Sequence, residues 1–220
     1  MFFLRKYGFY FLLLGVLSDF LTPYILGMFY PKLNQLTEVM SLFGDVGSPV
    51  RQAFLVWSII SGCLYVLAIP ALYQTFTPAS KSLGTILPVL VGLYGVTDCI
   101  FTGLFSVNTS ESSWNFSTWI HNVGSGIGYS GFILIPFIIF LLYRKLGETK
   151  SSQQFFIMMI VSFLFAGIYG VARIPGFNQL PIFNKLGFCQ RISFFFNYLP
   201  IAWLSILQIR KEMINRKARM

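Results

Sequence analysis

The sequence predicts an all-α integral membrane protein, a bundle of six transmembrane helices with both termini in the cytoplasm. Of its 220 residues, 55% are hydrophobic and only 10% are charged, whereas soluble domains carry about 25% charged residues. The mean hydropathy is +0.70. A soluble fold of this length could not bury so much apolar surface, so we expect the lipid bilayer to surround most of the chain.

A membrane-spanning helix needs about 20 mostly apolar residues, and six such segments follow one another along the chain. The first contains Asp19 and is not followed by a small-residue cleavage site, so we interpret it as a retained helix and not as a signal peptide. We predict one domain over residues 1–220. The predicted spans are 8–28, 50–73, 84–105, 119–143, 155–175 and 189–209.

Basic residues gather in alternate connections, which predicts the orientation. Eleven of the 16 Lys and Arg residues lie in the N-terminal tip, the second and fourth connections and the C-terminal tail. Such residues are enriched on the cytoplasmic side of membranes, so we place both termini there. We also expect the basic tail to lie on the anionic inner leaflet. The eleven are Arg5, Lys6, Lys81, Arg144, Lys145, Lys150, Arg210, Lys211, Arg216, Lys217 and Arg219.

The longest connection runs from Pro31 to Pro49 and is unusually apolar for a loop in water. It contains Leu42, Phe43 and two glycines. One interpretation is that it folds back over the outer mouth of the bundle. The other is a plain amphipathic connection at the membrane interface, and the sequence favours neither.

Each predicted span contributes one ionisable side chain, and these residues are our candidate ligand-binding site. Ionisable groups inside a bilayer are costly and usually functional. All except Asp19 fall near the extracytoplasmic ends of their helices. Three arginines at that depth suit a phosphate or carboxylate, and three helix N-termini point the same way. The six are Asp19, Arg51, Asp98, His121, Arg173 and Arg191.

A structural interpretation of the same residues stays open. Arg51 and Arg191 could extend their long side chains to the outer headgroups, while Arg173 pairs with Asp98 to hold two helices together. Asp98 and His121 could also pair, either as a proton relay or as a structural hydrogen bond.

Two predicted spans carry small residues at helical spacing. Gly124 and Gly128 lie near His121 in the fourth span, and Gly167 and Gly170 lie in the fifth. Such spacing lets a second backbone approach closely. Packing within one chain is our first interpretation, and a homodimer is the alternative.

Several kinds of site are not indicated. A single histidine does not make a typical zinc or haem site, and the three cysteines are widely spaced, so we predict no metal, no cofactor and cysteines that serve packing. The net charge of +9 comes from membrane-flanking segments, so we expect no nucleic-acid partner. The expected partners are membrane lipids, with a second copy or another membrane protein left open.

The first fifty residues carry a family resemblance. The runs Gly15–Tyr24, Tyr30-Pro31, Met40–Gly44 and Gly47–Arg51, together with Trp119–Gly124, are similar to bacterial membrane proteins classed as domain of unknown function 998. The resemblance implies a six-helix membrane domain in a bacterial plasma membrane and no established activity. A fainter likeness to FRAG/DRAM/Sfk-type proteins implies a lipid-related role.

The leading functional prediction is a non-enzymatic protein that binds an anionic lipid headgroup or small anion near the extracytoplasmic side, as an accessory or transport factor. One alternative is a proton-coupled transporter that uses Asp19, Asp98 and His121. It requires a water-filled path that connects Asp19 to one side of the membrane. The other is a lipid-modifying enzyme, which requires Asp98 and His121 within hydrogen-bond reach.

Overall fold

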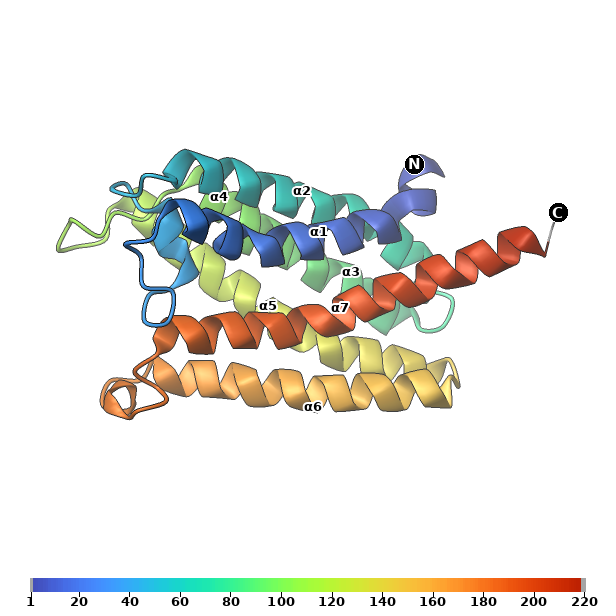
Figure 1. Ribbon diagram of the computed structural model, residues 1–220. Helices are drawn as coiled ribbons and strands as arrows, with labels where there is room; N and C mark the ends of the chain where they lie inside the picture. The colour runs from blue at the N-terminus through green and yellow to red at the C-terminus, as the bar shows by residue number, and fades with distance from the viewer. Residues whose placement is uncertain (1, 219–220) are drawn as a thin grey trace.

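Six helices are long and apolar enough to cross a bilayer, as the sequence predicts. The computed structural model describes residues 2–218, except the side chains of Phe2 and Asn178, and this part of the chain contains no strand. Arg219, one of the basic residues of the tail, lies outside the described residues. Figure 1 shows the helices lying alongside one another, with both chain ends at one end of the bundle.

The third span is not one regular α-helix, because a π-helical segment interrupts it. The other spans are single helices, and two short 3₁₀ turns lie in the connections. In chain order the elements are α1 (Phe2–Phe29), η1 (Met40–Gly44), α2 (Arg51–Phe76), α3 (Lys81–Leu93), η2 (Tyr94–Ile100, the π-helix), α4 (Phe101–Leu104), α5 (Phe116–Lys145), α6 (Thr149–Ala172), η3 (Phe177–Gln179) and α7 (Leu186–Lys217).

We name the two ends of the bundle by their connections. The termini end holds both chain ends and the short turns 77–80 and 146–148. The long-loop end holds the connections 30–50, 105–115 and 173–185. The eleven basic residues of the predicted cytoplasmic side belong to segments at the termini end, except that Arg219 is not described.

Most helix ends extend beyond the predicted spans. The start of α2 and the end of α4 fall one residue inside them, and the end of α6 falls three residues inside. The fifth span was expected to reach residue 175, but α6 ends at Ala172. Pro175 disfavours a helical conformation at the residue before it, and Gly176 has a φ of 93°, which a helix does not allow. These two residues therefore stop the helix early and turn the chain toward α7.

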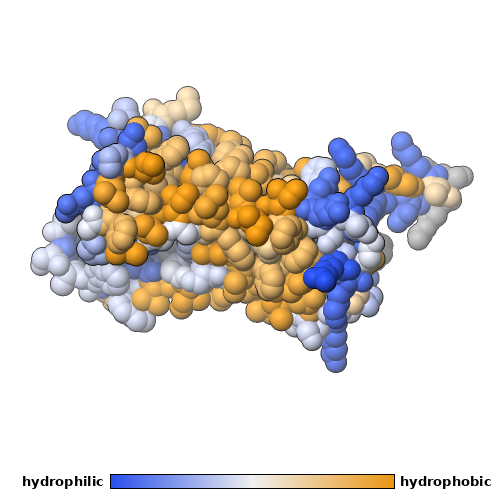
Figure 2. Space-filling view, turned by 90° about the horizontal axis from the view of Figure 1, so that it is seen from below, coloured by the Kyte–Doolittle hydropathy of each residue, from blue (hydrophilic) through white to orange (hydrophobic). Residues whose placement is uncertain are grey.

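Polarity along the bundle fits a membrane. Figure 2 shows a band of hydrophobic residues around the middle of one face, with hydrophilic residues gathered at both ends. Large apolar side chains such as Leu17, Ile60 and Leu164 are exposed on the helices, where a bilayer would cover them. The chain is therefore a multi-pass membrane protein.

Five spans surround the interior and the sixth covers them from outside. Neighbouring contacts run from α1 to α2, to α3 and η2, to α5, to α7 and back to α1, while α6 packs on α5 and α7. Aromatic side chains fill the centre of this ring, among them the fully buried Tyr65, Tyr94 and Phe132.

The connection between α1 and α2 folds back over the long-loop end. Phe43 and Leu33 are buried in a cluster with Phe54 of α2. The backbone N–H of Met40 donates to the Gln190 side chain at 2.7 Å, and that of Phe188 donates to the Leu36 carbonyl at 2.9 Å. Of the two interpretations of this loop, the structure shows the folded one.

Candidate functional site

A small cavity lies inside the ring, beneath η1, and holds three of the six predicted ionisable residues. Its volume is about 60 Å³, and Asp19, Asp98 and His121 all line it. Other polar lining comes from Ser58, Cys99, Thr102 and Ser125. We call this the inner cavity. The structure therefore brings together side chains from α1, η2 and α5 that are far apart in the sequence.

Asp19 lies in α1 and is surrounded by weakly acidic donors. Its Oδ2 accepts hydrogen bonds from the Tyr94 hydroxyl at 2.5 Å, the Tyr198 hydroxyl at 2.8 Å and the Cys99 thiol at 3.7 Å. Pro23, one turn later, has no N–H to donate to the Asp19 carbonyl. The side chain and backbone at this position are thus both polar sites inside the membrane.

Asp98 reaches the cavity because the helix changes from α-helical to π-helical geometry around it. It lies in the π-helix η2, and π-helical segments are frequent at functional sites. Asp98 Oδ1 accepts a hydrogen bond from the Ser125 hydroxyl at 2.5 Å. Gly128, one turn along α5 from Ser125, lets η2 approach, because a Cβ there would lie 2.6 Å from the Asp98 Cβ.

His121 is buried with one ring nitrogen unpaired. Its Nδ1 lies 2.7 Å from the Phe105 carbonyl, which can only accept, so Nδ1 carries a hydrogen. Nε2 has no protein partner, and only 1% of the residue is exposed. A buried polar atom without a partner costs free energy. His121 lines the inner cavity, so a ligand or water there can supply the missing hydrogen bond.

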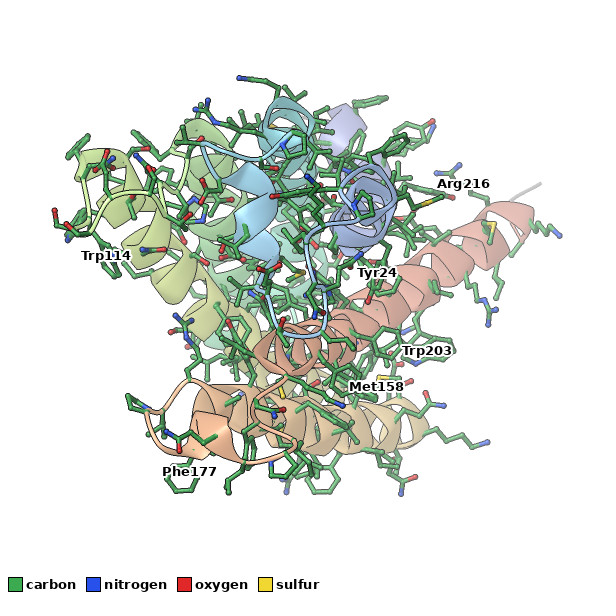
Figure 3. The ribbon with its side chains drawn as sticks, turned by 60° about the vertical axis from the view of Figure 1, so that its left-hand side comes forward. Tyr24, Trp114, Met158, Phe177, Trp203 and Arg216 are labelled. Carbon is green, nitrogen blue, oxygen red and sulfur yellow. The ribbon has the colours of Figure 1, made fainter. Side chains whose placement is uncertain are left out.

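A second cavity, which we call the outer cavity, adjoins the first on the side of α6. Its volume is about 230 Å³, and Arg173, Asn122, Tyr129, Tyr169 and Trp114 are among its lining residues. Figure 3 shows the loop of Trp114 and the segment of Phe177 standing apart at this end of the bundle. The two cavities share a wall formed by Ser41, His121, Ser125, Gln190 and Phe194.

The two cavities hold ionisable groups of opposite type, since carboxyl groups line the inner cavity and a guanidinium lines the outer one. Arg173 Nη1 donates to the Tyr169 hydroxyl at 3.4 Å, and its guanidinium lies 5.7 Å from that ring. The ion pairs found in residues 2–218 are Lys211–Glu148 and Arg216–Glu212. Within this part of the chain, no basic side chain therefore pairs with Asp19 or Asp98, and no acidic one pairs with Arg173.

The other two predicted arginines lie outside both cavities. Arg51 Nε donates to the Ser106 hydroxyl at 2.8 Å. Arg191 is buried under the α1–α2 connection and lines neither cavity. Of the predicted three-arginine anion site, the cavities keep Arg173 alone.

Two expected pairs are replaced by others. Asp98 binds Ser125 instead of His121 or Arg173, while His121 binds a backbone carbonyl and Arg173 binds Tyr169. Gly124 and Gly128 pack against η2 of the same chain, whereas Gly167 and Gly170 face open space. The glycines of α5 therefore serve packing within the chain, as first interpreted.

Sequence reasoning missed the hydroxyl and thiol groups around Asp19. Tyr94, Tyr198 and Cys99 appeared to be ordinary aromatic and packing residues, but all three donate to one carboxylate oxygen. The two tyrosines could have been noticed, since a buried tyrosine in a membrane span needs a hydrogen-bond partner for its hydroxyl.

One comparison with known proteins gives a result. A family described as "Protein of unknown function (DUF998)" matches residues 13–207, which include every residue that lines the two cavities. Among curated proteins and among solved structures, the chain has no match. The FRAG/DRAM/Sfk likeness and the bacterial origin stay predictions.

Proposed function

Because the chain belongs to the DUF998 family, whose description states no function, we propose one from the geometry of the site: a proton-coupled carrier of a small anion. Asp19 and Asp98 bind the coupling protons in the inner cavity, and Arg173 binds the anion in the outer cavity. The observation that supports this proposal is that a cavity lined by two carboxyl groups adjoins one lined by a guanidinium, with His121 and Ser125 in their common wall.

The size and chemistry of the inner cavity favour protons as its cationic occupant. A volume of about 60 Å³ has room for roughly four water molecules and is too small for an organic cation. A metal ion would need to displace the O–H and S–H donors that already surround Asp19 Oδ2. A proton adds to a carboxylate without displacing these donors.

The outer cavity suits a small anionic solute. Arg173 is exposed and bound only weakly, by a 3.4 Å hydrogen bond to a tyrosine hydroxyl. Asn122 and Gln190 add side-chain amides to the lining. An anion that enters with a proton moves less net charge through the membrane, which lowers the electrostatic cost of the passage.

Infrared spectroscopy tests proton binding without a known substrate. A carboxyl group that gains a proton acquires a C=O stretching band, so titration of the purified protein should show bands from the inner cavity. We expect Asp19→Asn and Asp98→Asn each to remove part of this signal. Asp45→Asn is the matched control, because Asp45 lies in the α1–α2 connection and lines neither cavity. Unchanged bands in both cavity variants would refute the proposal.

We further propose that the termini end is cytoplasmic, so that the outer cavity opens to the other side. The basic segments at the termini end support this orientation. A cysteine introduced at the exposed Ser110 should react with a membrane-impermeant thiol reagent in intact cells. A cysteine at the exposed Thr149 should react only after permeabilisation. The reverse pattern would show that the orientation is opposite.

A further inference from the structure

A third hollow lies apart from the two cavities, on the outside of the bundle between α1 and α7. Its volume is about 500 Å³, and its lining is mostly apolar, with Arg191 and Gln35 as polar members. Tyr24, Leu36 and Phe188 line it and are substantially exposed. We call it the α1–α7 groove. Because it opens on the bundle surface at the depth of the long-loop end, membrane lipid is the molecule that faces it.

Arg191 lines this groove and is held by only one of its terminal nitrogens. Its Nη1 donates to the backbone carbonyls of Gln35, Glu38 and Gly187 at 2.8, 2.9 and 3.0 Å. Nε and Nη2 are buried and have no partner in the protein. These two N–H groups lie along the same edge of the guanidinium, the edge that binds a carboxylate or phosphate with two parallel hydrogen bonds.

A buried guanidinium with a free edge is costly. Only 8% of Arg191 is exposed, and the pairs found in residues 2–218 give it no acidic neighbour. A charge removed from water without a counter-ion is strongly unfavourable. An oxyanion supplied from outside the protein would neutralise the charge and satisfy both nitrogens.

We propose that the α1–α7 groove binds one phospholipid, with an acyl chain on its apolar lining and the phosphate on the Nε–Nη2 edge of Arg191. The depth fits this occupant. Arg191 is the sixth residue of α7, about 8 Å along the axis from the start of the helix, where the polar and apolar parts of a lipid meet. The lining by Phe20, Ile192 and Phe195 suits hydrocarbon.

This site is separate from the proposed carrier function, because the groove shares no lining residue with the inner or the outer cavity. Its occupant would also brace the α1–α2 connection, since Arg191 is tied to the carbonyls of Gln35 and Glu38. That connection carries Ser41 into the wall of both cavities. A lipid in the groove would thus stabilise the cover of the candidate site from outside.

Native mass spectrometry of protein reconstituted with dioleoylphosphatidylglycerol and then stripped in mild detergent tests the proposal. We expect the wild type to retain one lipid, and Arg191→Gln to retain at least ten-fold less. Ile192→Trp should also lose the lipid, because it fills the groove while Arg191 stays in place. Arg51→Gln is the control, since Arg51 is bound to Ser106 outside the groove.

Retention by Arg191→Gln at the wild-type level, or no retained lipid in the wild type, would overturn the proposal. A parallel experiment with oleic acid identifies the source of the oxyanion. If oleic acid displaces phosphatidylglycerol from the wild type, the occupant is a fatty acid and the phospholipid assignment is wrong. Thermal unfolding of each variant in detergent shows whether lipid loss reflects the groove or a misfolded protein.

Discussion

Thiol reagents of opposite charge are expected to show opposite preferences at two cysteines placed one helical turn apart on α5. With Cys63, Cys99 and Cys189 replaced by serine, Asn122→Cys should react roughly ten-fold faster with an anionic methanethiosulfonate than with a cationic one. Ser125→Cys should prefer the cationic reagent by a similar factor. The rates are measured on purified protein in detergent.

The reason lies in the charges next to each position. Asn122 lines only the outer cavity, which contains Arg173, whereas Ser125 also lines the inner cavity and its hydroxyl contacts Asp98. Unit charges separated by about 10 Å interact by about 0.8 kcal/mol at an effective dielectric constant of about 40, between the values for water and for a protein surface. The two reagents carry opposite charges, so their barriers differ by about twice this energy, which corresponds to roughly a ten-fold ratio of rates. The direction of the preference therefore reports the sign of the local charge.

Two further substitutions assign these preferences to particular side chains. Arg173→Gln should abolish the anionic preference at residue 122, and Asp98→Asn should abolish the cationic preference at residue 125. Ser162→Cys should be unreactive, because Ser162 is fully buried and lines neither cavity. Equal rates with both reagents at residue 122 would mean that Arg173 does not attract anions into the outer cavity. Equal rates at residue 125 at every pH tested would mean that Asp98 does not exchange a proton, and either result would make the carrier proposal fail.

The fold could be predicted because each membrane span is visible in the sequence as a run of apolar residues. A run of about 20 apolar residues has few alternatives to a helix inside a bilayer, and all six predicted spans are present. Their ends were less accurate, since helices continue past the apolar run. In α7 the helix continues through basic residues to Lys217, whereas Pro175 and Gly176 shorten the fifth span by three residues.

The candidate site could be predicted only in part. Ionisable side chains stand out in an apolar sequence, so Asp19, Asp98 and His121 were found, and they do line one cavity. The arginines were less predictable. Arg191 is held by backbone carbonyls of a loop, and since every residue has a carbonyl, the sequence does not show which of them a side chain will contact. The π-helix that positions Asp98 depends on packing between helices and was equally invisible.

A single methyl group at Gly128 is expected to destabilise the protein, although alanine is normally preferred to glycine in a helix. A Cβ at this position would lie 2.6 Å from the Asp98 Cβ and 2.8 Å from the Asp98 backbone nitrogen. Since the second of these atoms belongs to the backbone of η2, a side-chain rotation cannot relieve the contact. Overpacking of this kind costs about 1–3 kcal/mol, so the unfolding temperature of Gly128→Ala in detergent should fall by several degrees.

Gly167→Ala is the matched control, because Gly167 is also helical and nothing lies within 4 Å of its added Cβ. There the helix preference of alanine acts alone, and it favours the folded state by up to about 1 kcal/mol. The two substitutions should therefore shift the unfolding temperature in opposite directions, although the chemical change is identical. If Gly128→Ala were as stable as Gly167→Ala, α5 and η2 would not be in the close contact that holds Asp98 against Ser125. The geometry of the inner cavity depends on that contact, so this comparison tests its structural basis independently of any ligand.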